Sequence, residues 1–258
     1  MRLFAISATS ALLTSVASAQ DTFSFVLYDA RSGAFVSAGG SCIDGDAIAG
    51  GAAVVSRVVP GRGVVHTQSY YHPDNQALSA RLLQVGLSAK PLLDSLTRAD
   101  VSLTPSFRQY VAVSADGEVA AFTGRDCAAW AGQRTGAGYA MAGNILLDST
   151  VLAAMEAALL ASRTRGDDML QQARATLLAA ATPGADRRCL ADRISCRSAF
   201  LRLAFPDDAP SELALDVRVL YPEGGRDPIV SLLGRLEGNA DAAAAAARLI
   251  QRVGPSPE

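Results

Sequence analysis

The sequence predicts an α+β fold: a four-layer αββα sandwich of two mainly antiparallel sheets, with helices covering both outer faces. Short runs of branched and aromatic residues occur in pairs joined by tight turns, and such hairpins favour antiparallel sheets. Two pairs of helical segments separate these groups of strands. The chain has 258 residues, which is enough for one large core. We expect one domain over residues 20–238, with a signal peptide at 1–19 and an alanine-rich helix and frayed tail at 239–258.

The first predicted hairpin begins at Thr22. Residues 22–29 are rich in aromatic and branched side chains, a turn follows, and residues 34–38 return as a second strand. Residues 39–53 are rich in glycine and alanine, so their backbone can approach a neighbouring layer or a ligand closely. This segment lacks the Gly-Lys-Ser/Thr ending of a phosphate-binding loop.

Two more strands are predicted over residues 54–59 and 64–70. The second ends in the polar residues Thr67, Gln68 and Ser69, which either line a cleft or form a solvated strand end.

Two helices follow these strands. Pro73 lies at an early position of the first helix and Gly86 ends it, while Ser88 caps the second. A hairpin is then predicted over residues 107–124, because Asp-Gly is a strong turn signal between two apolar runs.

The glycine-rich segment 126–146 predicts a strand and a close-packed loop. Asn144 lies at the edge of this element, where its side-chain amide either donates to an oxyanion or caps a turn. The remaining predictions are helices at 149–163 and 167–181, strands at 198–205 and 213–220, and helices at 227–236 and 239–253.

Composition excludes several classes of function. A net charge of −2 without a basic cluster argues against nucleic-acid binding. The sequence contains two histidines, His66 and His72, and no zinc-type spacing of cysteines, so we expect neither a metal site nor a cofactor.

The N-terminus predicts export. Arg2, a short apolar run and the small residues of Ala17-Ser18-Ala19 form a signal-peptide pattern that is too short and polar to span a membrane. No other stretch has the length and apolar character of a span, so we expect a periplasmic or secreted protein.

Four cysteines in an exported chain suggest disulfide bonds. Cys189 and Cys196 lie seven residues apart in a polar loop and are the expected local pair, which leaves Cys42 for Cys127.

Several short motifs together resemble a bacterial and archaeal family of uncharacterised proteins, usually labelled as members of the N-terminal-nucleophile (Ntn) hydrolase superfamily. The match covers roughly residues 22 to 237, and the string from Trp130 to Leu146 is its most specific part. The motifs are Thr-Phe-Ser at 22–24, Thr-Gln-Ser-Tyr at 67–70, Gly-Leu-Ser-Ala at 86–89, Asp-Gly at 116–117, Thr-Gly at 123–124, Cys127, the string 130–146, Asp-Arg-Arg at 186–188 and Asp-Pro-Ile at 227–229.

The resemblance implies an αββα sandwich and hydrolysis of an amide bond. Relatives that carry a peptidoglycan-binding module point to cell-wall peptides, although this chain has no such module. In the resulting hypothesis the hydroxyl of Thr22 attacks and its α-amine acts as the base. Asn144 holds the oxyanion together with backbone N–H groups.

The same hypothesis assigns the substrate to four further residues. Thr67 or Gln68 would orient it, and Asp186 or Arg187 would polarise it or bind a carboxylate. The partner is then a small molecule or a peptide, and the alanine-rich tail leaves room for a homo-oligomer.

One departure from the pattern matters for this hypothesis. Cleavage after Ala19 would leave Gln20 and Asp21 in front of Thr22, whose nitrogen would then be an amide. The alternative is therefore a catalytically silent Ntn-like domain that binds a ligand or partner in the periplasm. A serine–histidine hydrolase is the weaker third interpretation, because the sequence lacks a Gly-x-Ser-x-Gly elbow.

Overall fold

The computed structural model describes residues 22–254 of the chain. The predicted signal peptide and residues 255–258 lie outside the described residues. The described part contains a six-stranded sheet in the order β10-β9-β2-β1-β8-β7 and a four-stranded sheet in the order β3-β4-β5-β6. Every strand pair in both sheets is antiparallel.

Except within residues 126–146, the strands and helices follow one another in the order that the sequence predicts. The strands are β1 (Thr22–Asp29), β2 (Ala34–Ser41), β3 (Ser56–Val59), β4 (Gly63–Gln68), β5 (Gln109–Ser114), β6 (Val119–Thr123), β7 (Gly132–Gly136), β8 (Tyr139–Gly143), β9 (Ser198–Ala204) and β10 (Leu215–Val219). The α-helices are α1 (Pro73–Gln84), α2 (Ala89–Arg98), α3 (Thr150–Thr164), α4 (Met169–Ala179), α5 (Pro228–Leu236) and α6 (Ala240–Val253).

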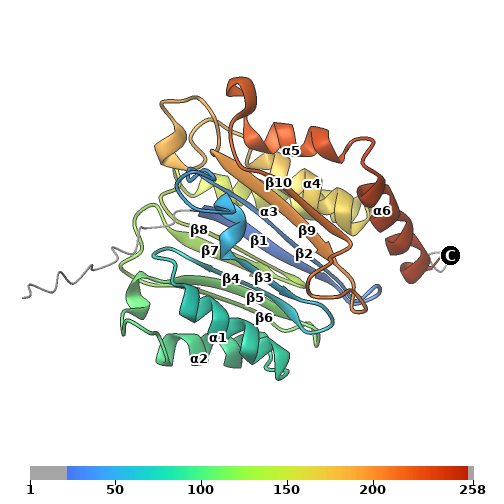
Figure 1. Ribbon diagram of the computed structural model, residues 1–258, viewed down its shortest axis with the longest axis horizontal. Coiled ribbons are helices and arrows are strands. Elements are labelled where there is room, and N and C mark those ends of the chain that lie inside the picture. The colour runs from blue at the N-terminus through green and yellow to red at the C-terminus, as the bar shows by residue number, and fades with distance from the viewer. Residues whose placement is uncertain (1–21, 255–258) are drawn as a thin grey trace, which may run out of the picture.

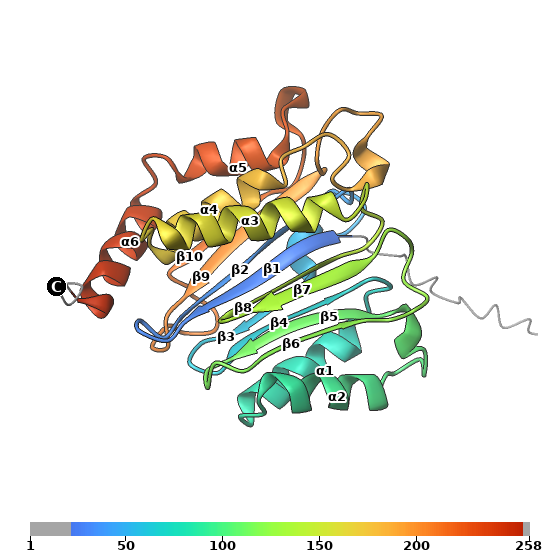
Figure 2. The ribbon, with the colours of Figure 1, turned by 180° about the vertical axis from the view of Figure 1, so that it is seen from behind.

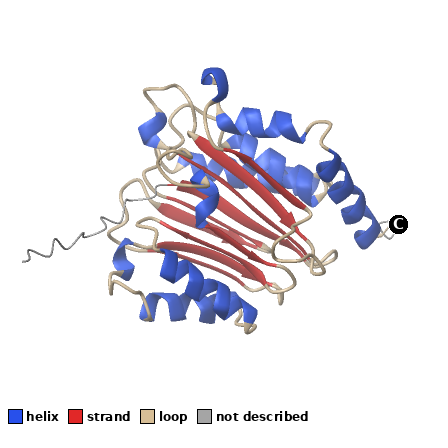
Figure 3. Cartoon of the chain, in the orientation of Figure 1, coloured by secondary structure: helices blue, strands red, loops and turns tan. Residues whose placement is uncertain are grey.

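The elements form layers. Helices α1 and α2 cover the outer face of the four-stranded sheet, and α3, α4 and α5 cover the outer face of the six-stranded sheet (Figure 1). The view from behind shows the same order of helices, sheet, sheet and helices (Figure 2). The two sheets are the red layers between the blue helices in Figure 3. This mixed α+β arrangement of two antiparallel sheets is consistent with the predicted sandwich.

Two local predictions differ from the structure. Residues 54 and 55 end a short 3₁₀-helix, η1 (Gly51–Val55), so strand β3 begins only at Ser56. Residues 126–146 form two strands instead of one, because Gly138 adopts a positive φ of 67° that permits a tight turn between β7 and β8.

Helix α6 packs on the chain's own core. Ala242, Ala245 and Leu249 are buried in the cluster that α3, α4 and α5 also join. The guanidinium groups of Arg248 and Arg252 lie 4.1 and 5.1 Å from the centre of the Phe205 ring. The helix therefore closes the far end of β9 and β10 within the same chain.

Candidate functional site

One end of the space between the two sheets is polar, whereas the other end is apolar. Phe23 and Phe25 of β1 pack among the helices of the outer layer. Because strand side chains alternate between faces, Thr22 and Ser24 face the four-stranded sheet. Val26 follows them on the same face and belongs to the apolar cluster between the sheets. The polar end therefore begins at the first residue of the central strand.

Three side-chain amides converge at this end. Gln68 Nε2 and the backbone N–H of Asn144 donate to the carbonyl oxygen of Thr22, over 3.3 and 3.2 Å. Gln109 Oε1 accepts from Gln68 Nε2 (2.7 Å) and from Asn144 Nδ2 (3.0 Å). Gln109 Nε2 also donates to backbone carbonyl oxygens of β7 and β8, at 3.1 and 2.9 Å. The amides thus connect the two sheets around Thr22, and all four residues are buried.

A second chain of hydrogen bonds runs inward from Gln68. Ser24 Oγ donates to Gln68 Oε1 over 2.6 Å and lies 2.8 Å from His66 Nδ1. His66 Nε2 lies 2.7 Å from Ser37 Oγ, which is 2.6 Å from Ser56 Oγ. Since the Ser24 hydroxyl proton is directed at Gln68, His66 Nδ1 must carry the hydrogen that it shares with Ser24. The imidazole then accepts at Nε2 from Ser37.

This arrangement makes His66 a neutral connecting group. Burial, together with the positive charge of Arg202, lowers the pKa of His66 to about 3. A protonated Nδ1 cannot take the proton of Ser24, so the geometry does not favour the serine–histidine hydrolase. His66 instead fixes Ser24, and through it the orientation of the Gln68 amide.

The backbone is strained where two strands leave this end. Ser69 and Tyr70, directly after β4, have φ values of 54° and 47°, and Ile145, directly after β8, has a φ of 50°. Such values are uncommon outside glycine, and for a branched residue such as isoleucine they are outliers. Within the described residues, Ser69 Oγ and Asn144 Oδ1 are also buried without a hydrogen-bond partner. Strain and unsatisfied polar atoms together mark a candidate functional site.

Thr67 does not lie with the other candidates. Val65 lies two residues before Thr67, on the same face of β4, and Tyr110 is the cross-strand partner of Thr67. Both Val65 and Tyr110 belong to the cluster beneath α1 and α2. By strand alternation, Thr67 faces that helix layer while Gln68 faces Thr22. Thr67 Oγ1 is buried there without a hydrogen-bond partner among the described residues.

Asp186 and Arg187 lie next to the candidate site but have local roles. The buried carboxylate of Asp186 accepts from the backbone N–H of Cys42 (2.8 Å) and from Arg188 Nη2 (2.7 Å). Arg187 is exposed, and its Nη2 donates to the carbonyl oxygen of Leu147 over 2.8 Å. Asp186 therefore anchors a loop, whereas the exposed Arg187 is held against the segment that follows Asn144.

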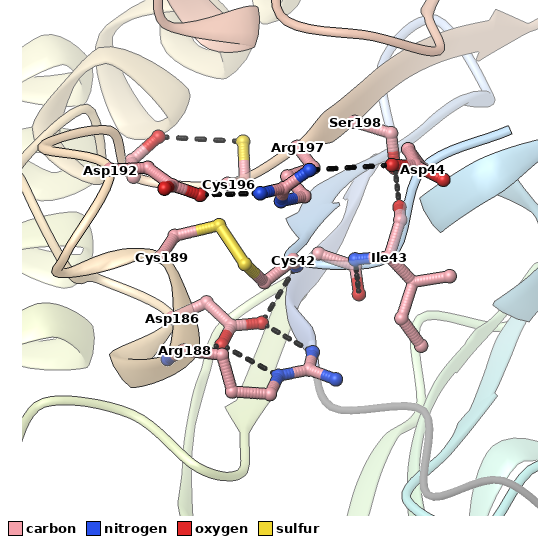
Figure 4. Close-up of a disulfide and its surroundings, with 12 residues drawn as sticks. Cys42, Ile43, Asp44, Asp186, Arg188, Cys189, Asp192, Cys196, Arg197 and Ser198 are labelled. Carbon is pink, nitrogen blue, oxygen red and sulfur yellow. Dashed lines mark hydrogen bonds and ion pairs between the residues drawn. A yellow bond between two sulfur atoms is a disulfide. The ribbon is translucent and has the colours of Figure 1, made fainter. Parts of the chain in front are cut away.

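The disulfide bond joins Cys42 to Cys189, with Cα atoms 5.7 Å apart (Figure 4). Both expected pairs, Cys189 with Cys196 and Cys42 with Cys127, are wrong. The contact between Asp186 and the N–H of Cys42 brings Cys189 to the end of β2. The nearby Cys196 is buried in the core, while Cys127 Sγ lies 3.3 Å from the carbonyl oxygen of Arg108 beside the four-stranded sheet. Spacing along the chain could not reveal these positions.

The described residues contain neither a metal-binding cluster nor a membrane-spanning helix. Between residues 22 and 254, no three His, Cys, Asp or Glu side chains lie together in a way that would hold a metal ion. In the same range, no helix has the length and apolar character needed to cross a membrane.

The sequence predictions missed Ser24, Ser37, His66 and Gln109. Alternation along β4 could have placed His66 on the same face as Gln68, two residues later. The partners of His66 lie 29 and 42 residues away, so no local pattern could have revealed them.

Comparison with known proteins adds the family and a related fold. Residues 22–232 match the family described as "Family of unknown function (DUF1028)". The crystal structure of protein SPO2555 from Silicibacter pomeroyi, itself described as DUF1028, is similar with a TM-score of 0.66 and 23% identity, over 87% of this chain and 93% of that one. At this identity the similarity concerns the fold alone. A comparison with curated proteins gives no match. Because the family match spans most of its length, the chain belongs to the DUF1028 family of unknown function.

Proposed function

We propose that the chain is an exported amide hydrolase of the Ntn type, with Thr22 as its nucleophile. The observation that supports this most is the place of Thr22, at the start of the central strand, with its carbonyl oxygen held by Asn144 and Gln68. The Cys42–Cys189 disulfide is consistent with an oxidising compartment, either the periplasm or the exterior.

The proposed reaction requires cleavage between Asp21 and Thr22. The new α-amine takes the proton of Thr22 Oγ as this oxygen attacks the carbonyl carbon of the substrate amide. The amine returns the proton to the leaving nitrogen, an ester forms on Thr22, and water then hydrolyses that ester. Thr22 is fully buried in the chain as given, so the same cleavage must also open the site.

Asn144 is the proposed oxyanion donor. One hydrogen of its Nδ2 is directed at Gln109, which fixes the plane of the amide and leaves the second hydrogen for the substrate oxygen. Its unpartnered Oδ1 can accept from the α-amine of Thr22 or from the substrate nitrogen. Removing a donor of this kind typically lowers the rate about 100- to 1000-fold.

The roles of the other candidates follow from their positions. Gln68 shares the inner face with Thr22 and orients the substrate, whereas we assign no substrate contact to Thr67. Arg187 is exposed, so it can bind a substrate carboxylate such as that of a cell-wall peptide. We assign Asp186 to the anchoring of its loop.

A second function is a silent domain that binds a ligand or partner. It is favoured by the full burial of Thr22 and by Gln20-Asp21, which cleavage after Ala19 would leave attached to its nitrogen. Periodate distinguishes the two, because it oxidises a 1,2-amino alcohol and therefore reacts with a threonine whose α-amine is free. Oxidation of the exported protein supports catalysis, and a resistant protein supports binding.

Turnover provides the second test. The exported protein and its Thr22→Ala and Thr22→Ser variants would be assayed with p-nitroanilides of N-acyl amino acids and with short cell-wall peptides. We expect Thr22→Ala to lose turnover, Thr22→Ser to retain part of it, and the surface control Thr164→Ala to keep all of it. Full activity in Thr22→Ala removes the proposal.

A further inference from the structure

A cavity of about 740 Å³ lies at the other end of β1 from Thr22. Tyr28 and Asp29 line it from β1, Arg163 from α3, Met169 from α4, and Leu249 and Ile250 from α6. Since β1 has eight residues at about 3.3 Å each, this cavity is about 23 Å from Thr22 along the strand. Its size is within the usual range for small-molecule sites, about 300–1,000 Å³.

The floor of the cavity is apolar. Leu27, Met169 and Leu249 line it and are 1%, 5% and 2% exposed. Ile250, at 65% exposure, lies at the rim. The cavity therefore offers a place for a hydrocarbon group.

The carboxylates of the cavity are already occupied. Asp29 accepts from the backbone N–H groups of Arg31 and Ser32, at 3.2 and 3.1 Å. Asp167 is paired with Arg165 over 2.6 Å, and Asp168 caps α4 through the N–H of Gln171. None of the three requires a ligand to satisfy it.

The guanidinium groups of Arg163 and Arg31, in contrast, keep hydrogen-bond donors that the protein does not use. Arg163 Nη1 donates to the carbonyl oxygen of Ala137 (2.7 Å) and Nε donates to Gln172 Oε1 (3.2 Å), while its Cζ lies 5.2 Å from the centre of the Tyr139 ring. These bonds use two of its five N–H groups. Arg31 Nη2 donates to the carbonyl oxygen of Val253 (3.0 Å). Neither arginine has a carboxylate within ion-pair distance among the described residues.

The charges therefore balance around the cavity, but the hydrogen-bond donors do not. Asp29, Asp167 and Asp168 face Arg31, Arg163 and the nearby Arg165, so no net field favours a cation or an anion. The free donors nevertheless include those of the half-buried Arg163. Burial lowers the pKa of Arg163, and the nearby Tyr139 and Asp29 offset this desolvation only in part. A planar carboxylate fits these donors best.

We propose that this cavity binds a small amphiphile with one carboxylate, such as a medium-chain carboxylic acid or an N-acyl amino acid. The carboxylate would lie between Arg163 and Arg31, and the apolar group over Leu27, Met169 and Leu249. The family match ends at residue 232, so the wall that α6 provides lies outside it. The proposal does not depend on a reaction at Thr22.

The test is titration calorimetry with decanoate, with decanol as the neutral control. We expect decanoate to bind at one site and decanol about 10-fold or more weakly. Arg163→Gln should weaken decanoate about 10- to 100-fold, because it removes a charge-assisted bond. The control Arg98→Gln, at an exposed position of α2 in the other helix layer, should leave the affinity unchanged.

A second pair of variants covers the case in which Arg163→Gln does not fold. Ile250 is mostly exposed at the rim, so Ile250→Glu and Ile250→Gln should both fold. Relative to Ile250→Gln, the glutamate should weaken decanoate about 3- to 5-fold at low salt. Equal affinity for decanoate and decanol, no binding at millimolar decanoate, or no difference between the two Ile250 variants overturns the proposal.

Discussion

The buried imidazole of His66 makes the stability of the protein depend on pH. Its pKa is about 3 in the folded protein, against a usual value of 6.5. A depressed pKa means that the unfolded chain takes up the proton first as the pH falls. The contribution of His66 is therefore complete above pH 6.5 and is lost progressively between that value and pH 3.

The size of the effect follows from the two pKa values. Between about pH 7 and about pH 5, His66 alone should lower the free energy of unfolding by about 2 kcal/mol. The imidazole is 0% exposed, so solvent does not screen this difference. The buried carboxylate of Asp100 does not contribute in that range: burial alone would raise its pKa, but the bonds from Arg108, Thr104 and Asn75 prevail and lower it to about 2.

Urea unfolding followed by circular dichroism at the two pH values measures this loss. The variant His66→Gln should be less stable at both pH values but should lack the extra loss of about 2 kcal/mol at about pH 5. His72→Gln changes the N-cap of α1 and keeps His66, so it should show the same loss as the unmodified protein. An identical loss in the unmodified protein and in His66→Gln would refute the assignment of His66 as a buried neutral group.

Four further substitutions test the buried ion pair, the disulfide bond and the packing around two glycines. Arg108→Leu leaves the buried Asp100 carboxylate without its partner at 2.7 Å and should lower stability by about 3–5 kcal/mol in urea unfolding. Cys42→Ser opens a loop with a sequence separation of 147 and should lower stability by about 5 kcal/mol on the chain-entropy model, which a fall in thermal midpoint measures. Gly39→Ala places a Cβ 2.6 Å from a carbonyl oxygen of β1 and should destabilise by about 1–3 kcal/mol, as measured by calorimetry. Gly234→Ala, in a helix with open space at that position, should stabilise by up to about 1 kcal/mol in the same assay.

Much of the fold could be predicted because its signals are local. The aromatic and branched residues after Thr22, the Asp-Gly turn at 116–117 and the proline at the start of α1 each act within a few residues. The corresponding strands and helix appear where these signals place them. Strand β7 was not predicted because its sequence, Gly-Gln-Arg-Thr-Gly, has little strand propensity. The strand is stabilised by its pairing with β8.

The site was harder to predict because its contacts are distant in sequence. Thr22, Gln68 and Asn144 do come together, but the residue that joins the two amides is Gln109, from a different strand. Thr67 shows how sensitive such predictions are to register, because one step along a strand reverses the side that a residue faces. The disulfide pairing could not be predicted for the same reason. The loop at Asp186 brings Cys189 to Cys42, and the spacing of cysteines along the chain does not reveal this contact.

The proposed function requires that Thr22 becomes a free N-terminal nucleophile. Intact mass spectrometry of the protein recovered after export measures this most directly, because chains starting at Gln20 and at Thr22 differ by one glutamine and one aspartate residue. We predict the mass of a chain that begins at Thr22, and we expect this mass to shift after periodate oxidation. A mass that begins at Gln20 and is unchanged by periodate would contradict the proposed function.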